Sequence, residues 1–362
     1  MNYLIDKKDG PVYIQLYRQI KDDIINGAFS YGNKLPSKRL LAEETGVSTI
    51  TVEHAYSLLC DEGYAESRQR SGYFVTFRQT DGFASTGRIK NTRKHSRLST
   101  SNCPDFSVSV LTKTMRKVLT DYRDVLLEKT PNFGCVELRE AIKQYLARNR
   151  GIAVDTRQIV IGSGAEYLYR MIIELLGKDK IYAIEAPSYE KIEQIYYASG
   201  AKYEMLPISE NGIESDALSS SSADVLHTTP YESLPSGVTA SASKRHEYIR
   251  WAGTSGRFII ESDYGSEFYV SSQPMETLFA MSKNDNVIYL NTFSRTISPS
   301  MRVGYMVLPK KLVRKFEDKL GFYSCTVPTY EQYVLAELIN NGDFERHINR
   351  VRRSKRKEFS GK

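Results

Sequence analysis

Only four of the 362 residues are cysteines, and no run of about 18 apolar residues occurs anywhere in the sequence. The cysteines are scattered, without the spacing of a metal site or a disulfide framework: Cys60, Cys103, Cys135 and Cys325. The amino-terminal sequence MNYLIDKKDGPVY lacks the apolar core of a signal peptide. These absences argue against a membrane protein, a metal centre and a secreted disulfide scaffold. We therefore expect a cytoplasmic protein with no membrane partner and no bound metal.

Positive charge is in excess, because 50 lysines and arginines stand against 43 acidic residues and give a net charge of +7. Two basic segments contain no acid at all, residues 88–99 (RIKNTRKHSRLS) and 346–357 (RHINRVRRSKRK). A polyanion is therefore a candidate partner. Runs of this kind are more often solvated linkers or tails, so charge alone is weak support for that partner.

The length of the chain predicts at least two hydrophobic cores. Residues 10–76 have the pattern of a small helical unit followed by two short strands. Residues 77–104 are polar and basic, contain Gly82 and Gly87, and show no apolar period, which is typical of a flexible linker. We expect residues 105–362 to form a second and larger domain.

Three helices are predicted in the first domain. Pro11 starts the first helix, and Asn26-Gly27 ends it. Ser37 is expected to cap a second helix that ends at Thr45-Gly46, and Ser48 a third. The third helix directs four apolar side chains inward: Val52, Ala55, Tyr56 and Leu59. Two helices joined by a short turn make a helix-turn-helix, and YAESRQRSGYFV follows as a two-stranded wing.

Helical stretches alternate with short apolar runs in the second domain. Residues 138–149 and 165–177 are predicted helices. The strand-like runs are 158–162, 180–185, 224–229, 257–262, 287–293 and 303–309. This alternation predicts an α/β fold with a mostly parallel sheet, helices on both faces, and a site at the carboxyl ends of the strands.

The segment LPSKRLLAEETGVSTITVEHAYSLLCDEGYAESRQRSGYFV resembles the winged helix of the GntR family through its P-S-x-R entry, T-V-x-x-A-Y helix and E-S-R-x-x-S-G wing. The resemblance implies that the helix from Ser48 to His54 enters the major groove of a double-stranded DNA operator, and that the wing reaches the backbone or minor groove. The implied DNA-binding residues are Ser37, Arg39, Ser48, Thr49, Thr51, His54, Arg68, Arg70 and Gly72.

Physical chemistry supports these roles, since helix N-termini offer N–H groups to phosphate and arginine pairs with guanine edges. Thr49, Ile50 and Glu53 make the recognition helix less basic than in many relatives. We therefore expect phosphate affinity to come largely from the wing and Arg39. A small helical packing module is the alternative interpretation.

The sequence from about residue 105 onward resembles fold-type I aminotransferases, and with the winged helix in front the whole resembles MocR/GabR-type regulators. The motifs are IVIGSGAEYLY, EAPSY, TTPYESLPSGVTAS, ESDYGSEF and TFSRTISPSMRVGY. The resemblance implies a homodimer and a site for pyridoxal phosphate. Backbone N–H groups of Ser163, Gly164 and Ala165 would hold the phosphate with Thr292 and Arg302. Tyr189 would stack on the ring and Tyr264 would hydrogen-bond its hydroxyl group.

Three departures weaken the implied chemistry. Arg295 stands where the family has the Schiff-base lysine, and a guanidinium stays protonated and cannot attack an aldehyde. Ser262 replaces the aspartate that keeps the pyridine nitrogen protonated, and Asp263 could serve only if the strand end shifted by one residue. The chain also ends where relatives continue into a small domain with a substrate-binding arginine, so we expect an incomplete substrate site. Lys283, Lys310 and Lys311 are near in sequence, but none falls on the same turn.

Two interpretations of Arg295 remain open: it contacts a phosphate or a small anionic effector, or it forms a surface or interdomain ion pair in a decayed site. Ser163, Thr292 and Arg302 are interpreted as a surviving anion site, against purely structural roles in turns.

Three functions follow. The first is a DNA-binding regulator with a non-catalytic, dimeric sensing domain and pyridoxal phosphate held non-covalently at most. The second is a working pyridoxal-phosphate regulator or aminotransferase. The third is a remnant that binds DNA without an effector response.

Overall fold

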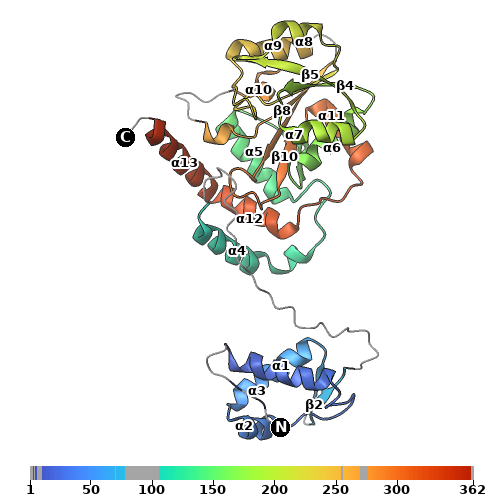
Figure 1. The fold of residues 1–362 in the computed structure, drawn as a ribbon, viewed down its shortest axis with the longest axis vertical. Coiled ribbons are helices and arrows are strands. Elements are labelled where there is room, and N and C mark those ends of the chain that lie inside the picture. Colours follow the sequence, from blue (N-terminus) through green and yellow to red (C-terminus); the bar gives the residue numbers. More distant parts are fainter. Residues whose placement is uncertain are drawn as a thin grey trace. The chain divides into compact units, whose positions relative to one another are not determined.

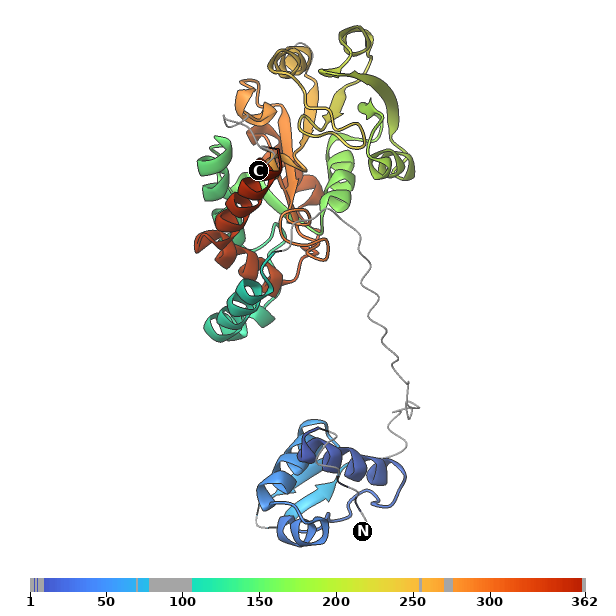
Figure 2. The same ribbon diagram turned by 60° about the vertical axis from the view of Figure 1, so that its left-hand side comes forward.

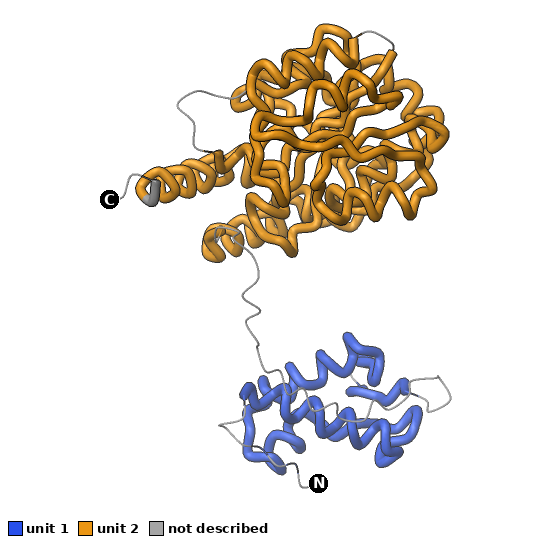
Figure 3. The backbone as a smooth tube through the Cα atoms, turned by 45° about the horizontal axis from the view of Figure 1, so that its top comes forward, with its two compact units in different colours: residues 1–98 blue, residues 99–362 orange. Residues whose placement is uncertain are grey.

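The computed structural model describes residues 3, 5, 10–69, 71–77, 106–253, 256–269 and 276–359. The chain divides into two compact units, residues 1–98 and 99–362 (Figure 3). The predicted linker, residues 77–104, lies outside the described residues except for Phe77.

The amino-terminal unit contains the predicted helix-turn-helix and wing (Figure 1). Its elements are α1 (Val12–Ile25), α2 (Lys38–Thr45), α3 (Thr49–Asp61), β1 (Ala65–Arg68) and β2 (Gly72–Val75). The two predicted caps are confirmed, since the Ser37 hydroxyl accepts a hydrogen bond from the Leu40 N–H at 3.2 Å and the Ser48 hydroxyl accepts one from the Thr51 N–H at 3.1 Å. Gly46 ends α2 in the left-handed region at φ 66°, which glycine adopts without strain.

The core of this unit forms where α1 and α3 pack together. Leu16 and Ile20 of α1 and Tyr56 and Leu59 of α3 are almost fully buried, at the helical spacing expected from the sequence. The Tyr56 hydroxyl donates to the Pro36 carbonyl at 2.8 Å and so ties α3 to the segment that enters α2.

The larger unit is built on an eight-stranded sheet in the order β3-β10-β9-β8-β7-β4-β5-β6. The strands are β3 (Ile159–Gly162), β4 (Ile181–Ala186), β5 (Lys202–Ser209), β6 (Gly212–Ile213), β7 (Val225–Thr228), β8 (Phe258–Ser262), β9 (Val287–Thr292) and β10 (Gly304–Val307). The neighbours from β9 to β5 are parallel, and β10 is antiparallel to both of its partners. The predicted, mostly parallel α/β sheet is confirmed.

Helices cover both faces of this sheet. They are α4 (Val108–Tyr122), α5 (Val136–Arg150), α6 (Ala165–Leu176), α7 (Glu190–Ala198), α8 (Ser215–Ser220), α9 (Ala242–Gly253), α10 (Leu278–Met281), α11 (Lys310–Leu320), α12 (Thr329–Asn340) and α13 (Asp343–Phe359). Strand β3 shows the division, because Ile159 and Ile161 pack with α5, α12 and α13 while Val160 packs with α6, α7 and α11. Both groups can be followed in Figure 1 and Figure 2. No helix in the described ranges is long and apolar enough to span a membrane.

Strands β5 and β6 were not predicted. Most of the β5 side chains are exposed or half-buried, and only Leu206 is buried. The short β6 closes the sheet next to it. Because β5 buries only one side chain, its sequence lacks the continuous apolar run that marks the central strands, and β6 is only two residues long.

Leu59→Ala should destabilise the amino-terminal unit by about 2–5 kcal/mol, because it leaves a cavity in a fully buried part of the core. Hydrogen exchange of the α1 and α3 amides measures this loss. Leu40→Ala is the matched control, since Leu40 is 49% exposed in the same unit. Equal loss of protection in both variants would contradict the assignment of Leu59 to the core.

Candidate DNA interface and ligand cavity

Helix α3 presents a polar face to solvent. Thr49, Glu53 and His54 are exposed, and Ile50 is 63% exposed. Thr51 is half-buried, and its hydroxyl lies 2.8 Å from the Ser48 hydroxyl. The predicted recognition residues therefore share the start and outer face of one helix, where they can reach the edges of bases.

Two ion pairs set the charge of this face. Lys38 of α2 bonds to Glu53 of α3 at 2.8 Å, and this hydrogen bond lowers the pKa of the Glu53 carboxyl. Glu53, the acid that makes the recognition helix less basic, is thus paired with a lysine. Arg39 is 88% exposed and lies 3.4 Å from Glu43, so an exposed arginine stands at the start of α2.

The wing places an arginine and a glycine opposite each other. Arg68 pairs with Gly72 across the two strands, bonds to Glu66 at 2.7 Å and lies 4.4 Å from the centre of the Phe74 ring. Gly72 has φ 109°, and an added Cβ would come within 2.9 Å of the Lys34 side chain. The predicted Arg70 lies outside the described residues. Lys34, the residue beside Gly72, belongs to none of the quoted motifs.

A cavity of about 100 Å³ lies at the carboxyl ends of β4, β7, β8 and β9. It is lined by Ala165, Glu166, Tyr169, Tyr189, Lys191, Ile192, Thr229, Glu232, Leu234, Ser262, Tyr264, Thr292, Ser294 and Arg302. Five predicted residues are brought together there: Ala165, Tyr189, Tyr264, Thr292 and Arg302. Three others, Ser163, Gly164 and Arg295, contact neighbouring residues without lining the cavity.

The end of β8 fixes which side chain faces this cavity. Ser262 lines it and hydrogen-bonds with the Tyr169 hydroxyl. Asp263 accepts a hydrogen bond from the Tyr289 hydroxyl at 2.7 Å and lies 3.5 Å from Arg150. The strand end is therefore not shifted, and Asp263 does not take the place of the missing aspartate.

Arg295 forms an ion pair inside the larger unit. Its guanidinium bonds to the Glu232 carboxylate at 3.0 Å and lies 5.2 Å from the centre of the Tyr264 ring. A Cβ at Gly265 would meet that guanidinium, so a larger residue there would require the arginine to shift. The ion pair that one of the two interpretations of Arg295 expected is present, and its partner belongs to the same unit. Contact of Arg295 with an anionic ligand stays a prediction.

The expected phosphate cup holds a carboxylate of the protein itself. Glu166 bonds to Arg302 at 2.6 Å and to Lys191 at 2.6 Å. The hydrogen bond from Lys191 lowers the pKa of the Glu166 carboxyl and raises the pKa of the lysine. The Ser163 hydroxyl, expected nearby, accepts a hydrogen bond from the Thr326 hydroxyl at 2.9 Å.

The sequence interpretation missed Glu166, Lys191 and Glu232. All three lie in or next to the quoted motifs, at positions 166, 191 and 232. An acid directly after the expected phosphate-binding turn was a readable signal for Glu166. No local pattern shows that Glu232 would meet Arg295, because the two are 63 residues apart.

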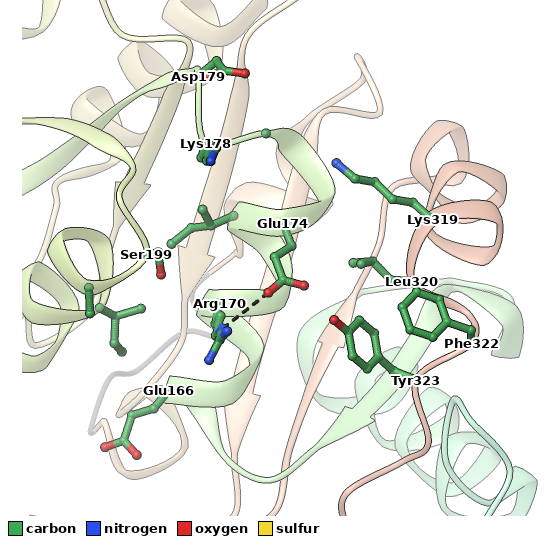
Figure 4. Close-up of a pocket in the computed structure, with 14 residues that line it drawn as sticks. Glu166, Arg170, Glu174, Lys178, Asp179, Ser199, Lys319, Leu320, Phe322 and Tyr323 are labelled. Atoms are coloured by element: carbon green, nitrogen blue, oxygen red, sulfur yellow. Dashed lines mark hydrogen bonds and ion pairs between the residues drawn. The ribbon is translucent and has the colours of Figure 1, made fainter.

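A second hollow of about 740 Å³ lies on the outer side of α6. Figure 4 shows Arg170 and Glu174 joined on this helix, with Phe322 and Tyr323 on the opposite side. The two rings stack with their centres 4.3 Å apart. Among the described residues, only Glu166 lines both this hollow and the smaller cavity.

Two known families match different parts of the chain. Residues 12–75 match the family described as bacterial regulatory proteins of the gntR family, and residues 94–358 match aminotransferase class I and II. The chain is 33% identical to the HTH-type transcriptional regulator YdeL of Bacillus subtilis over 97% of its own length and 78% of that protein. It is 27% identical to the probable rhizopine catabolism regulatory protein MocR of Rhizobium meliloti, over 95% of this chain and 75% of MocR.

A further regulator and two solved aminotransferase structures are also similar to this chain. The chain is 26% identical to the pyridoxine biosynthesis regulator PdxR of Corynebacterium glutamicum, over 94% of this chain and 75% of PdxR. The kynurenine aminotransferase of Pyrococcus horikoshii has a TM-score of 0.64 and 25% identity, over 70% of this chain. An archaeal alanine:glyoxylate aminotransferase has a TM-score of 0.63 and 24% identity, over 68% of this chain. This chain spans 66% and 64% of those two enzymes.

Acid should destabilise the larger unit through His227, a buried residue of β7 whose ring lies 4.7 Å from that of Tyr169. Burial lowers the pKa of His227 from 6.5 to about 3, so between these values the unfolded chain binds a proton that the folded chain does not. Its contribution to stability is present above pH 6.5 and is lost as the pH falls, by at most roughly 1.4 kcal/mol per pH unit. Urea unfolding at several pH values gives the free energy of unfolding as a function of pH. This free energy should fall less steeply with decreasing pH in His227→Gln than in the wild type. The same change at exposed His246 is the control, and an unchanged slope for His227→Gln would refute the role of this histidine.

Proposed function

We propose that this chain, which belongs to the MocR/GabR-type family of transcription regulators, binds an operator through its winged helix and senses a small ligand through a non-catalytic aminotransferase class I and II domain. The ion pair of Arg295 with Glu232 carries the proposal, because it occupies the turn from which a lysine would act in an aminotransferase. A homodimer that binds two half-sites is part of the same proposal.

The amino-terminal unit supplies the DNA contact in this proposal. The exposed Thr49 and His54 would face base edges, and Arg39 would reach a phosphate or a guanine beside α2. Ser37 and Ser48 keep the two helix starts in place, since both hydroxyls are used as caps. Arg68 and Gly72 bring the wing toward the backbone, where contacts position the protein without reading the sequence.

The residues of the larger unit do not fit a covalently held pyridoxal phosphate. Tyr189 and Tyr264 could contact its ring. Arg295 cannot capture its aldehyde, and Ser262 cannot hold a proton on its pyridine nitrogen. The aminotransferase fold relates this chain to proteins that use pyridoxal phosphate. We propose that any ring ligand in the cavity is bound non-covalently.

A working pyridoxal-phosphate enzyme is the second candidate, and one observation favours it: Lys191 is a primary amine that lines the cavity. The hydrogen bond to Glu166 raises the pKa of this lysine, so its amine stays protonated and is a poor nucleophile. The regulator without catalysis is therefore the better supported of the two.

Arg39→Ala should weaken operator binding by about 1–3 kcal/mol if Arg39 reads a base. Fluorescence anisotropy with labelled operator DNA at fixed salt measures the change. Arg314→Ala is a matched control, because Arg314 is 92% exposed and also faces an acid four residues later. A loss no greater than that of the control would reject the role of Arg39.

Borohydride reduction after incubation with pyridoxal phosphate or pyridoxal should leave no pyridoxyl group on a cavity lysine of the wild-type protein. Arg295→Lys combined with Glu232→Gln should permit capture at position 295, because it supplies an amine and removes the carboxylate that would keep that amine protonated. Peptide mass mapping locates the modified lysines and separates them from surface background. A pyridoxyl group mapped to Lys191 in the wild type would overturn the non-catalytic assignment.

A further inference from the structure

Helix α3 carries an isoleucine on its outer face. Ile50 is 63% exposed, more than any other large hydrophobic side chain in the described part of the amino-terminal unit. At about 100° per residue, Ile50 and the fully buried Leu59 lie on opposite sides of the helix. Ile50 therefore points away from the core of its own unit. A single exposed isoleucine is ordinary on a protein surface, so its place on the helix decides what it can do.

That place is the first turn of the predicted recognition helix. Ile50 follows the cap residue Ser48 and Thr49, and it shares the exposed face of α3 with Glu53 and His54. In helix-turn-helix proteins, the amino-terminal residues of the recognition helix contact the edges of bases in the major groove. In the proposed operator complex, Ile50 is therefore among the side chains nearest to the bases.

Several polar groups around Ile50 already have partners within the protein. The Ser48 hydroxyl accepts a hydrogen bond from the Thr51 N–H at 3.1 Å and lies 2.8 Å from the Thr51 hydroxyl. The Glu53 carboxylate is bonded to Lys38 at 2.8 Å. These contacts reduce the hydrogen-bonding capacity that the start of α3 can offer to base edges. Ile50 can contribute only an apolar surface, which requires an apolar group on the DNA.

The major groove offers one such group. Thymine presents a methyl group on its major-groove edge, whereas cytosine presents an amino group there, and the purines present hydrogen-bonding atoms. An isoleucine neither donates nor accepts a hydrogen bond, so it matches the thymine methyl and none of the polar patterns. Burial of one group of methyl size should contribute about fourfold to affinity.

We propose that Ile50 reads the methyl group of a thymine in the operator and is a specificity-determining residue of the winged helix. The inference rests on the proposed function, in which α3 enters the major groove of operator DNA. It adds an apolar contact to those assigned to Arg39, Thr49 and His54. Each half-site should then contain an A·T pair beneath the start of α3.

Selection from a random duplex library tests this proposal before the operator is known. Two libraries of the same design, one made with thymine and one with uracil in its place, differ only in the methyl group. The full-length chain should select a motif with a fixed thymine from the first library and lose the preference at that position in the second.

A direct affinity measurement follows from the selected motif. Replacement of the fixed thymine by uracil in one half-site should weaken binding about fourfold, measured by fluorescence anisotropy at fixed salt. Because the protein is the same in both measurements, a folding defect cannot produce this difference.

Ile50→Ser should bind the thymine and uracil duplexes about equally, because it removes the apolar contact. Serine has a helix propensity similar to that of isoleucine, and the position is exposed, so the unit should stay folded. Leu40→Ser is the matched control, since Leu40 is another exposed aliphatic side chain, 49% exposed, and lies on α2. This control should keep the roughly fourfold difference between the duplexes.

The same motif with equal affinity from both libraries would overturn the role of Ile50 and leave operator binding standing. A thymine preference that survives in Ile50→Ser, or that is lost in Leu40→Ser as well, would also overturn it. Selection of no motif by the wild type would instead contradict the proposed operator binding, and the inference on Ile50 with it. The two proposals therefore fail in different measurements.

Discussion

The proposed function of the larger unit rests on the carboxylate–cation pairs at the carboxyl ends of the parallel strands. Glu232 holds Arg295 over the Tyr264 ring, and Glu166 holds Arg302 beside the α6 turn. An aminotransferase needs a deprotonated amine and an open anion site at these two places. In the proposed function, both cations are paired within the protein, and the tyrosines that line the cavity stand without an amine at position 295.

A buried polar network maintains this arrangement from the other face of the sheet. Arg150, Asp263 and Glu267 are each at most 6% exposed in their side chains, and the Tyr289 hydroxyl joins them through Asp263. Removing Arg150 would leave two buried carboxylates without their cation, which is strongly destabilising. The network therefore fixes the end of β8 in one register. Because side chains alternate between the faces of a strand, this register also sets Ser262 toward the cavity.

The sequence was sufficient for the central strands, the caps and the winged helix, because each has a local signal. The buried strands are continuous apolar runs, and Ser37 and Ser48 each precede a helical period. Strand β5, which only the two-residue β6 separates from the edge of the sheet, has no such run. The ion pairs were beyond sequence reasoning for another reason: Glu166 and Arg302 are 136 residues apart, so only the folded sheet shows that they neutralise each other.

Loss of the lysine changes how binding energy can be used. In an enzyme, interactions with the ligand accelerate a reaction only when they strengthen in the transition state. In the proposed non-catalytic function, the same interactions can only favour one conformation of the protein over another, to the extent that the ligand binds the two differently. Tyr264 lines the cavity, and the centre of its ring lies 5.2 Å from the Arg295 guanidinium. A ring that stacks on Tyr264 therefore acts next to the ion pair of Glu232 and Arg295, and a shift of that pair is a physical means by which binding could be sensed.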